Sequence, residues 1–428
     1  MSLSLSLKIP FMIRRLMRNR HLKPSEVREL QSKKLKALVK HSYSNVPYYR
    51  SLFKEIGLYP DDIKSVDDLD KIPILKKEDI RDLPVGQVTA KNIDLRKCWM
   101  FRTAGTTGTP MSIYWKKEAR LYQWLRNYIW QLNCGDKITN RRVILGGSMP
   151  DTPRLVQKIG IFKTKRLSPF DSPETQIKQI KDFGPKTMIT MPSCVMDLCK
   201  EINEKNIDGL NLRLVFTGGE LLDEYTRNIV RETFEAELFD GYGANEVGRI
   251  SSECVEQIGY HVSSDSIILE ITKDGEAMST GEEGEITVTN LDNLAMPFIR
   301  YNLEDFGILI DDECSCGCYF PLMKITRGRK SNVIQLPDGR AISAIRVYFD
   351  LILIQGIRKF QVIQEKIDQI IIKIVKDNRF TDETCEKIKQ IFKQRLGNIE
   401  IDVSIVDNIP RDKSGKLQPF ITRIPVKY

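Results

Sequence analysis

Hydrophobic positions change their spacing several times along the chain, and each spacing predicts a different kind of element. In residues 25–57 the leucines recur at helical spacing, and Pro47 interrupts the pattern. The runs RRVILGG and KTMITM are apolar and end in small or turn-forming residues, which is typical of buried strands. Amphipathic helical stretches alternate with such strands over about residues 115–240, so α/β architecture is predicted there.

Beyond that region the pattern becomes one of short strands, such as SIILEIT, GEITVTN and FGILI. The end of the chain differs again. A helix over 342–353 precedes the strands RKFQVIQEK and DQIIIKIVK, and a helix from Thr381 to about Arg395 precedes the strand IEIDVSIV. Two helices on one small sheet would form a separate α+β domain. We therefore expect a large N-terminal α/β domain, residues 1–329, and a small C-terminal domain, residues 330–428.

The composition is that of a globular protein, with 428 residues of which 41% are hydrophobic and 29% charged. No apolar run approaches the ~20 residues of a membrane span. The first twenty residues lack the long apolar core and the cleavage site of a secretory signal. With nine cysteines, this indicates a cytoplasmic protein whose cysteines serve as core residues, ligands or nucleophiles.

The net charge of +9 is concentrated in the first part of the chain, since residues 1–50 carry twelve Lys/Arg and only two Asp/Glu. A nucleic-acid-binding protein would spread basic charge over a face of its folded domain, so nucleic acid is not expected as a partner. The excess instead forms a basic arm, residues 1–22, in which apolar residues share one helical face with arginines on the rest: Ile9, Met12, Ile13, Leu16 and Met17. A helix packed on its own domain is the favoured interpretation of the arm, and contact with an anionic membrane is the alternative.

The segment RTAGTTGTPMSIYW contains a loop of small residues. Positions 103–110 hold four threonines, two glycines, an alanine and a proline, and an apolar strand follows. Glycines let backbone N–H groups turn inward and hydroxyls add donors without bulk, so such a loop can surround phosphate oxygens. It lacks the G-K-[ST] ending of a Walker loop, and taken alone it also fits an ordinary turn.

Four other stretches carry polar residues on turns: FTGGE (216–220), GYGANEVG (241–248), IRYNLEDFG (299–307) and NIPRDKSGKLQPF (408–420). In this order and spacing, the five segments resemble the adenylate-forming superfamily of acyl- and aryl-CoA ligases. The chain is most similar to the phenylacetate–CoA ligase-like branch, which includes capsular polysaccharide biosynthesis proteins. NVPYYR, MPFIRY and ITRGRKSNVI are further marks of that branch.

The resemblance implies how ATP is bound. The threonine loop would hold the β- and γ-phosphates through Thr103, Gly105, Thr106, Thr107 and Gly108. The adenine would be lined by Gly218, Gly219 and Glu220. Tyr242 would stack near the base, Asp305 would hold the ribose hydroxyls, and Arg329 would contact the nucleotide at the domain junction.

The resemblance also implies a mobile C-terminal domain and two catalytic residues. Lys416 would bridge the substrate carboxylate and the α-phosphate, and Glu246 would coordinate Mg²⁺. These residue types suit the attack of a carboxylate on ATP, because two anions that meet need charge neutralisation more than an acid or a base. Ala104 stands where relatives carry a hydroxyl residue and Asn332 where many carry aspartate, so a nucleotide-binding protein without catalysis stays open.

A cysteine-rich segment, CSCGC, supplies Cys314, Cys316 and Cys318. Three cysteines in five residues are poor core residues and good soft metal ligands, although reduced surface cysteines fit the cluster as well. Some relatives carry a C-x-C-G element that looks like part of a structural zinc site with an upstream Cys and His. This resemblance implies a Zn²⁺ site formed by Cys254, His261, Cys314 and Cys316, with Cys318 as a spare.

We therefore expect an adenylate-forming ligase of the acid–thiol type. It would activate a small-molecule carboxylic acid with ATP and Mg²⁺ as an acyl-adenylate and transfer the acyl group to coenzyme A. The alternative is transfer to an amine or hydroxyl acceptor in capsular or surface polysaccharide biosynthesis. Two kinds of partner stay open: a membrane contacted peripherally by the arm, and a second copy of the chain in a homodimer.

Overall fold

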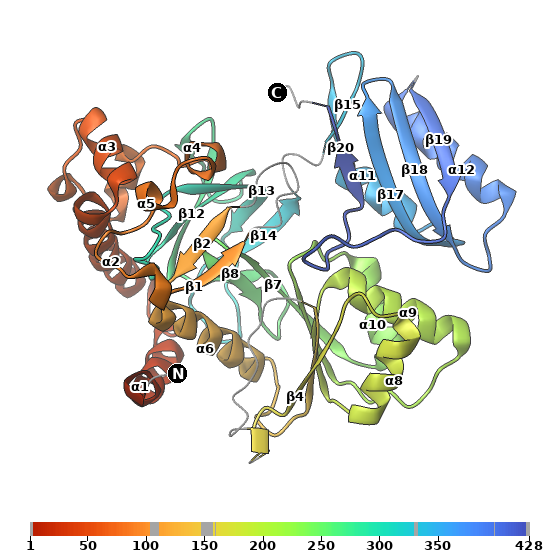
Figure 1. The fold of residues 1–428 in the computed structure, drawn as a ribbon, viewed down its shortest axis with the longest axis horizontal. Helices are drawn as coiled ribbons and strands as arrows, with labels where there is room; N and C mark the ends of the chain where they lie inside the picture. The colour runs from red at the N-terminus through yellow and green to blue at the C-terminus, as the bar shows by residue number, and fades with distance from the viewer. Residues whose placement is uncertain are drawn as a thin grey trace. The chain divides into compact units, whose positions relative to one another are not determined.

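The computed structural model describes residues 3–102, 111–146, 157–158, 160–328, 333–397 and 399–424 (Figure 1). The chain divides into two compact units. The first consists mainly of residues up to Thr139 and of Phe239–Thr326, and the second mainly of Asn140–Ser148, Pro153–Leu238 and Arg327–Tyr428. The predicted boundary between residues 329 and 330 stays a prediction. Among the described residues, none of the helices combines the length and the apolar character needed to cross a bilayer.

Helices open the first unit: α1 (Leu3–Asn19), α2 (Pro24–Asn45), α3 (Pro47–Glu55), α4 (Lys77–Arg81), α5 (Val85–Val88), α6 (Lys117–Asn133) and the 3₁₀ turns Pro60–Asp62, Val66–Lys71 and Leu95–Lys97. The predicted interruption at Pro47 is confirmed, because α2 ends at Asn45 and α3 begins at Pro47 itself. Proline disfavours a helical conformation for the residue before it and suits the first turn of the next helix. Val46 between them is extended, with φ −109° and ψ 114°.

The strands of the first unit include an antiparallel pair, β1 (Trp99–Arg102) and β2 (Ser112–Trp115). The others lie in the order β11-β10-β12-β13-β14-β9-β8-β7. Their bounds are β7 (Glu237–Ala244), β8 (Gly248–Glu253), β9 (Tyr260–Val262), β10 (Ile267–Lys273), β11 (Glu276–Ala277), β12 (Gly284–Asn290), β13 (Tyr301–Ile310) and β14 (Leu322–Arg327). The predicted strands SIILEIT, GEITVTN and FGILI correspond to β10, β12 and part of β13. One core joins these strands to the helices and includes Leu35, Phe53, Ile286 and Phe298.

The second unit has parallel strands in the order β6-β5-β3-β4. They are β3 (Arg142–Leu145), β4 (Thr164–Leu167), β5 (Thr187–Thr190) and β6 (Leu214–Gly218), and the helices α8 (Pro173–Phe183), α9 (Pro192–Lys205) and α10 (Glu224–Phe234) lie beside them (Figure 1). The predicted strands RRVILGG and KTMITM are β3 and β5. Two helices begin at capping side chains: Ser172 accepts a bond from the Thr175 N–H at 3.3 Å, and Asp223 accepts one from the Thr226 N–H at 2.7 Å.

The C-terminal part of this unit contains a β-hairpin, a small sheet and two helices. Their bounds are β15 (Val333–Gln335), β16 (Ala341–Ser343), α11 (Ala344–Ile352), β17 (Ile357–Lys366), β18 (Gln369–Lys376), α12 (Asp382–Leu396), β19 (Glu400–Ile405) and β20 (Phe420–Thr422). The sheet order is β19-β18-β17-β20, and both helices lie on one face of it (Figure 1). Alternate isoleucines of β18 are buried against Ile388 and Phe392 of α12, as the predicted α+β arrangement requires. Strand β20 was not predicted.

Candidate functional site

Lys416 lies in a turn that leads from β19 towards β20, and the carboxylate of Asp412 organises this turn. Asp412 Oδ1 accepts hydrogen bonds from the N–H groups of Ser414 at 2.8 Å and Lys416 at 3.0 Å. Burial disfavours the charge of Asp412, but its bonds with Ser414 and Lys416 hold the pKa of its carboxyl below the ordinary value. Gly415 has φ +85°, and a Cβ there would lie 2.7 Å from Pro169 Cγ, so the turn needs glycine at this position.

The fold brings this turn to the segment FTGGE, which lies almost two hundred residues earlier in the chain. Gly218 ends β6, and Gly219 follows with φ +86°. A Cβ on Gly219 would stand 3.5 Å from Cε and 3.7 Å from Nζ of Lys416. Glu220 Oε1 accepts a hydrogen bond from the Leu417 N–H at 2.9 Å. The predicted adenine-lining segment and the predicted catalytic lysine therefore meet within one unit.

Sequence reasoning missed three residues that support this contact, all of them polar. Ser193, in the first turn of α9, donates to Glu220 from its backbone N–H at 2.9 Å and from its hydroxyl at 3.0 Å. Arg411 donates to the Ser193 hydroxyl at 2.6 Å and to Asp197 Oδ2 at 2.7 Å. Arg411 and the turn were visible in the segment NIPRDKSGK, but no periodicity of the sequence indicated their partners on α9.

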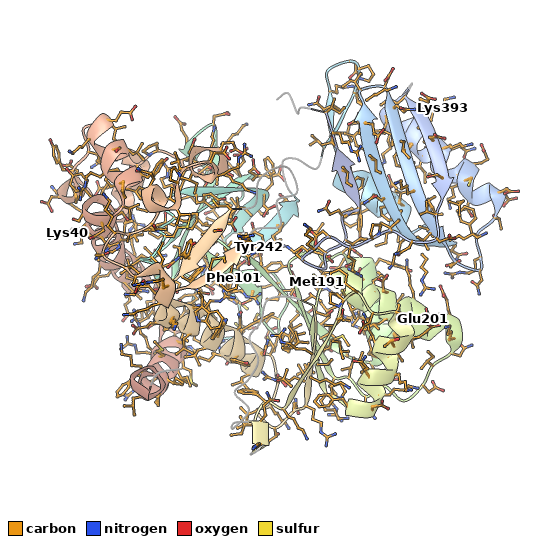
Figure 2. The ribbon with its side chains drawn as sticks, viewed as in Figure 1. Lys40, Phe101, Met191, Glu201, Tyr242 and Lys393 are labelled. Carbon is orange, nitrogen blue, oxygen red and sulfur yellow. The ribbon has the colours of Figure 1, made fainter. Side chains whose placement is uncertain are left out.

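Helix α9 makes further polar contacts with β17. Glu201, labelled in Figure 2, forms an ion pair with Arg358, and Glu204 Oε2 accepts a bond from Arg358 Nη1 at 2.9 Å. Lys200 donates to the carbonyl oxygens of Ile357 at 3.1 Å and Arg358 at 2.7 Å. Burial lowers the pKa of Lys200 to about 8. Above about pH 8, the neutral amine of Lys200 is consequently more stable than its ammonium form.

In the first unit, two further predicted nucleotide-binding residues contact each other. Tyr242 lies on β7 and is labelled in Figure 2, and Asp305 lies on β13. The Tyr242 hydroxyl donates to Asp305 Oδ2 at 2.6 Å. Both side chains are partly buried. This hydrogen bond fixes the orientation of a carboxylate that can accept from a diol, with an aromatic ring next to it.

Glu246 lies in the tight turn between β7 and β8, and its side chain is partly buried. The indole N–H of Trp115 donates to the Asn245 carbonyl at 3.0 Å. A Cβ on Gly243 would lie 2.5 Å from the Gly248 carbonyl oxygen, so the two strands approach as closely as glycine permits. Trp115 ends β2, the strand that follows the threonine loop. The turn thus presents a carboxylate, a ligand type that Mg²⁺ accepts, on a firmly held backbone.

The remaining predicted nucleotide-binding residues lie outside the described residues. They are Arg329 and the loop residues Thr103, Gly105, Thr106, Thr107 and Gly108. The strands on either side of the loop are described: β1 and β2 pair antiparallel, with Arg102 opposite Ser112.

A cluster of soft ligands lies elsewhere in the first unit. One ligand atom from each of Cys254, His261, Cys314 and Cys316 lies within 4.8 Å of all the others. Cys254 Sγ is 3.5 Å from Cys314 Sγ, and Cys316 Sγ is 3.3 Å from His261 Nε2. His261 Nδ1 is 2.9 Å from the Phe320 carbonyl oxygen, so Nδ1 carries the proton and Nε2 faces the sulfurs. Burial raises the pKa of the Cys254 and Cys314 thiols, so thiolates there need a cation.

Cys318 does not belong to this group of four. It is buried in an apolar cluster with Val27 and Phe320. Its predicted role as a spare cysteine stays a prediction.

The basic arm forms α1, which packs on α6, as the favoured interpretation predicted. Leu16 is buried, Lys8 pairs with Glu118 at 3.0 Å, and Asn19 Nδ2 donates to Asp265 Oδ2 at 2.9 Å. The sequence pattern predicts Met17 on the same face as Leu16, but Met17 is 54% exposed. A turn of about 100° per residue is enough to carry it off the packed face.

The chain is similar to known proteins in sequence and in structure. Residues 334–423 match the CapK C-terminal domain. The chain is 28% identical to the phenylacetate-coenzyme A ligase of Pseudomonas putida over 66% of its length and 67% of the relative's. It is 27% identical to the enzyme of the same name from Thermus thermophilus over 72% of each chain. The solved structure of 2-hydroxyisobutyryl-CoA ligase matches 95% of this chain and 91% of its own with a TM-score of 0.79 at 16% identity, which confirms the predicted fold class. These similarities in sequence and fold support the resemblance to the adenylate-forming superfamily and to its phenylacetate–CoA ligase-like branch.

Proposed function

We propose that this protein is an ATP-dependent acid–thiol ligase, which activates a small-molecule carboxylic acid as an acyl-adenylate and transfers the acyl group to coenzyme A. The observation that carries the proposal is the position of Lys416 beside the Gly219–Glu220 segment, because the fold brings together two motifs that are far apart in the sequence. The phenylacetate-coenzyme A ligases among the relatives support the same reaction class.

In the first half-reaction, an oxygen of the substrate carboxylate attacks the α-phosphorus of ATP, and the bond to pyrophosphate breaks. The Lys416 ammonium offsets the negative charge that carboxylate and phosphate share in the transition state. The carboxylate of Glu246 would hold Mg²⁺, which when bound neutralises phosphate oxygens. The step needs no proton transfer, and a side chain with a fixed positive charge suffices.

We propose a role in nucleotide binding for each of the other residues that the resemblance implies. Asp305 would accept hydrogen bonds from the ribose hydroxyls, and Tyr242 would stack near the base while its hydroxyl orients Asp305. Gly219 would leave the adenine and Lys416 room that a side chain would fill. The threonine loop would bind the β- and γ-phosphates, and Arg329 would contact the nucleotide.

The second half-reaction would need a movement of the C-terminal domain, because Lys416 cannot remain at the adenylate while a thiol approaches it. We expect rotation about Lys330–Ser331, which lie outside the described residues. Ser331→Pro should therefore impair acyl transfer more than adenylation. Equal loss of both steps would point to simple destabilisation.

Two measurements test the proposed function. Pyrophosphate release from ATP, screened over a panel of carboxylic acids, should show dependence on particular acids. Product formation should then require coenzyme A. An amine or hydroxyl of a surface-polysaccharide precursor is the less favoured acyl acceptor, because the relatives are coenzyme A ligases. Release of pyrophosphate with none of the acids would contradict the proposal.

We also propose that the four-residue cluster holds a structural Zn²⁺. Zn–S bonds of about 2.3 Å and Zn–N bonds of about 2.0–2.1 Å in a tetrahedron separate two sulfurs by about 3.8 Å and a sulfur from a nitrogen by about 3.6 Å. The separations of 3.5 Å and 3.3 Å are each about 0.3 Å shorter than these values, and the four ligand atoms lie within 4.8 Å of one another, so the cluster is compact enough to surround one ion. Cys254 and His261 would bind from the β8–β9 region, and Cys314 and Cys316 from the loop after β13. The ion would join two loops and take no part in adenylation.

We also propose that the solvent-exposed face of α1 contacts an anionic membrane. Leu7 is 68% and Phe11 77% exposed, and the exposed arginines Arg14 and Arg18 continue the same helical face. Sedimentation with phosphatidylglycerol vesicles should be lost in the variant Leu7→Ser/Phe11→Ser, with phosphatidylcholine vesicles as the control. If this variant bound phosphatidylglycerol vesicles as well as the wild type does, this face of α1 would be ruled out as the membrane-binding surface. The cytoplasmic location and the homodimer stay predictions.

A further inference from the structure

The carboxylate of Glu220 is engaged by the protein itself. Oε1 accepts from the Leu417 N–H at 2.9 Å and from the Ser193 hydroxyl at 3.0 Å, and Oε2 accepts from the Ser193 N–H at 2.9 Å. Resemblance to relatives implied only that this residue lines the adenine. Its hydrogen bonds instead connect α9 to the residue directly after Lys416.

Arg411 connects the other side of the turn to the same serine. Its guanidinium donates to the Ser193 hydroxyl at 2.6 Å, to Asp197 Oδ2 at 2.7 Å and to the Gly415 carbonyl at 3.1 Å. The Arg411 side chain is only 7% exposed. The Ser193 hydroxyl therefore accepts from Arg411 and donates to Glu220, so that the Lys416 turn is held from both ends. We refer to Ser193, Glu220 and Arg411 as the clamp.

We propose that Glu220 is a positioning residue for adenylation: through the clamp it fixes the backbone on both sides of Lys416 and so holds the ammonium beside Gly219. This inference rests on the proposed function. A lysine has a flexible four-carbon stem, and its backbone must be fixed before its charge can be aimed. Electrostatic stabilisation depends on such preorganisation, and a misplacement of about 1 Å can cost a factor of ~10² in rate.

The first experiment measures the two half-reactions separately in Glu220→Gln. This variant keeps the side-chain size, but one of its two acceptor oxygens becomes a donor facing N–H groups. Acid-dependent exchange of pyrophosphate into ATP should slow about tenfold in kcat, the effect of losing a hydrogen bond to a charged group. The KM for ATP and the coenzyme A-dependent consumption of supplied acyl-adenylate should change less than about twofold. A raised KM for ATP with unchanged kcat would overturn the proposal, because Glu220 would then act on the nucleotide.

The control and the double variant sharpen the result. Glu224→Gln removes a carboxylate whose side chain is 83% exposed, on the first turn of α10, and should leave both half-reactions unchanged. Glu220→Gln combined with Lys416→Ala should be no slower than Lys416→Ala alone, because Glu220 acts through Lys416. If the two losses multiplied, Glu220 would have another role and the clamp would be wrong as a positioning device.

Amide hydrogen exchange tests the clamp without reference to catalysis. Peptides covering residues 408–420 should exchange about tenfold faster in Glu220→Gln than in the wild type, and at the wild-type rate in Glu224→Gln. Unchanged exchange in Glu220→Gln would overturn the clamp even in an active enzyme. Faster exchange in a protein that adenylates none of the acids would support the clamp and contradict the proposed function, so the two failures can be told apart.

Discussion

Lys416→Ala should remove the cation from its turn and leave the turn itself in place. The backbone is held by Asp412, which accepts from the Lys416 N–H at 3.0 Å, and by Glu220, which accepts from the Leu417 N–H at 2.9 Å. Neither contact uses the lysine side chain. A loss of rate in this variant therefore reports on the ammonium group.

The size of the loss follows from the charge and its surroundings. Two unit charges about 4 Å apart interact by about 4 kcal/mol at the effective dielectric constant of ~20 that suits sites near a protein surface. Lys416 is partly buried, so solvent weakens this interaction only in part. Removal of one electrostatic stabiliser typically costs a factor of ~10²–10³ in kcat. We expect adenylation to fall by that factor and ATP binding to weaken by less than about tenfold, because the lysine acts mainly on charge that develops in the transition state.

The assay is acid-dependent exchange of labelled pyrophosphate into ATP, which reports adenylation without acyl transfer. Lys413→Ala is the matched control, since it removes an exposed lysine from the same turn. It should lose less than about twofold, the effect of an exposed charge. Near-normal exchange in Lys416→Ala would refute the catalytic assignment. An equal loss in both variants would show that overall charge, and not the position of Lys416, governs the rate.

Three further changes test other parts of the structure. Wild-type protein purified without chelator should contain about one zinc per chain. The double variant Cys314→Ser/Cys316→Ser should bind no zinc and should unfold at a lower midpoint before its adenylation rate falls. Wild-type protein that is folded, active and free of zinc would contradict this prediction. Because burial lowers the pKa of Lys200 from 10.5 to about 8, the unfolded state binds more protons between these values, so the free energy of unfolding should rise with pH across that window. Lys200→Met should reduce this rise by at most about 3 kcal/mol in urea unfolding, and an unchanged pH slope would speak against a buried ammonium. Tyr242→Phe removes the hydroxyl that donates to Asp305 at 2.6 Å, so the KM for ATP should rise about threefold to tenfold with kcat nearly constant, and an unchanged KM would separate this pair from the nucleotide.

The elements of the fold were largely predictable because they depend on local patterns. Helical spacing and Pro47 predicted α2, α3 and the break between them, and apolar runs predicted β3 and β5. The alternation of Ile370, Ile372 and Ile374 likewise marks β18 as a strand with one buried face. Strand β20 escaped prediction because it has only three residues and pairs with β17, about sixty positions earlier. So short a segment carries no period, and its pairing partner decides its structure.

The functional site was likewise predictable only in part. The polar turns that carry Lys416 and Glu246 and the cysteine-rich segment CSCGC were visible in the sequence, but the roles of Lys416 and Glu246 were inferred from the family resemblance. The ligand group with His261 was inferred from resemblance, and the tertiary structure brought its four ligand atoms within 4.8 Å of one another. Only the tertiary structure identified the clamp, because Ser193 and Arg411 are separated by more than two hundred residues. Hydrophobic periodicity reports which face of an element is buried, whereas a hydrogen bond between distant polar side chains depends on how the whole chain is packed.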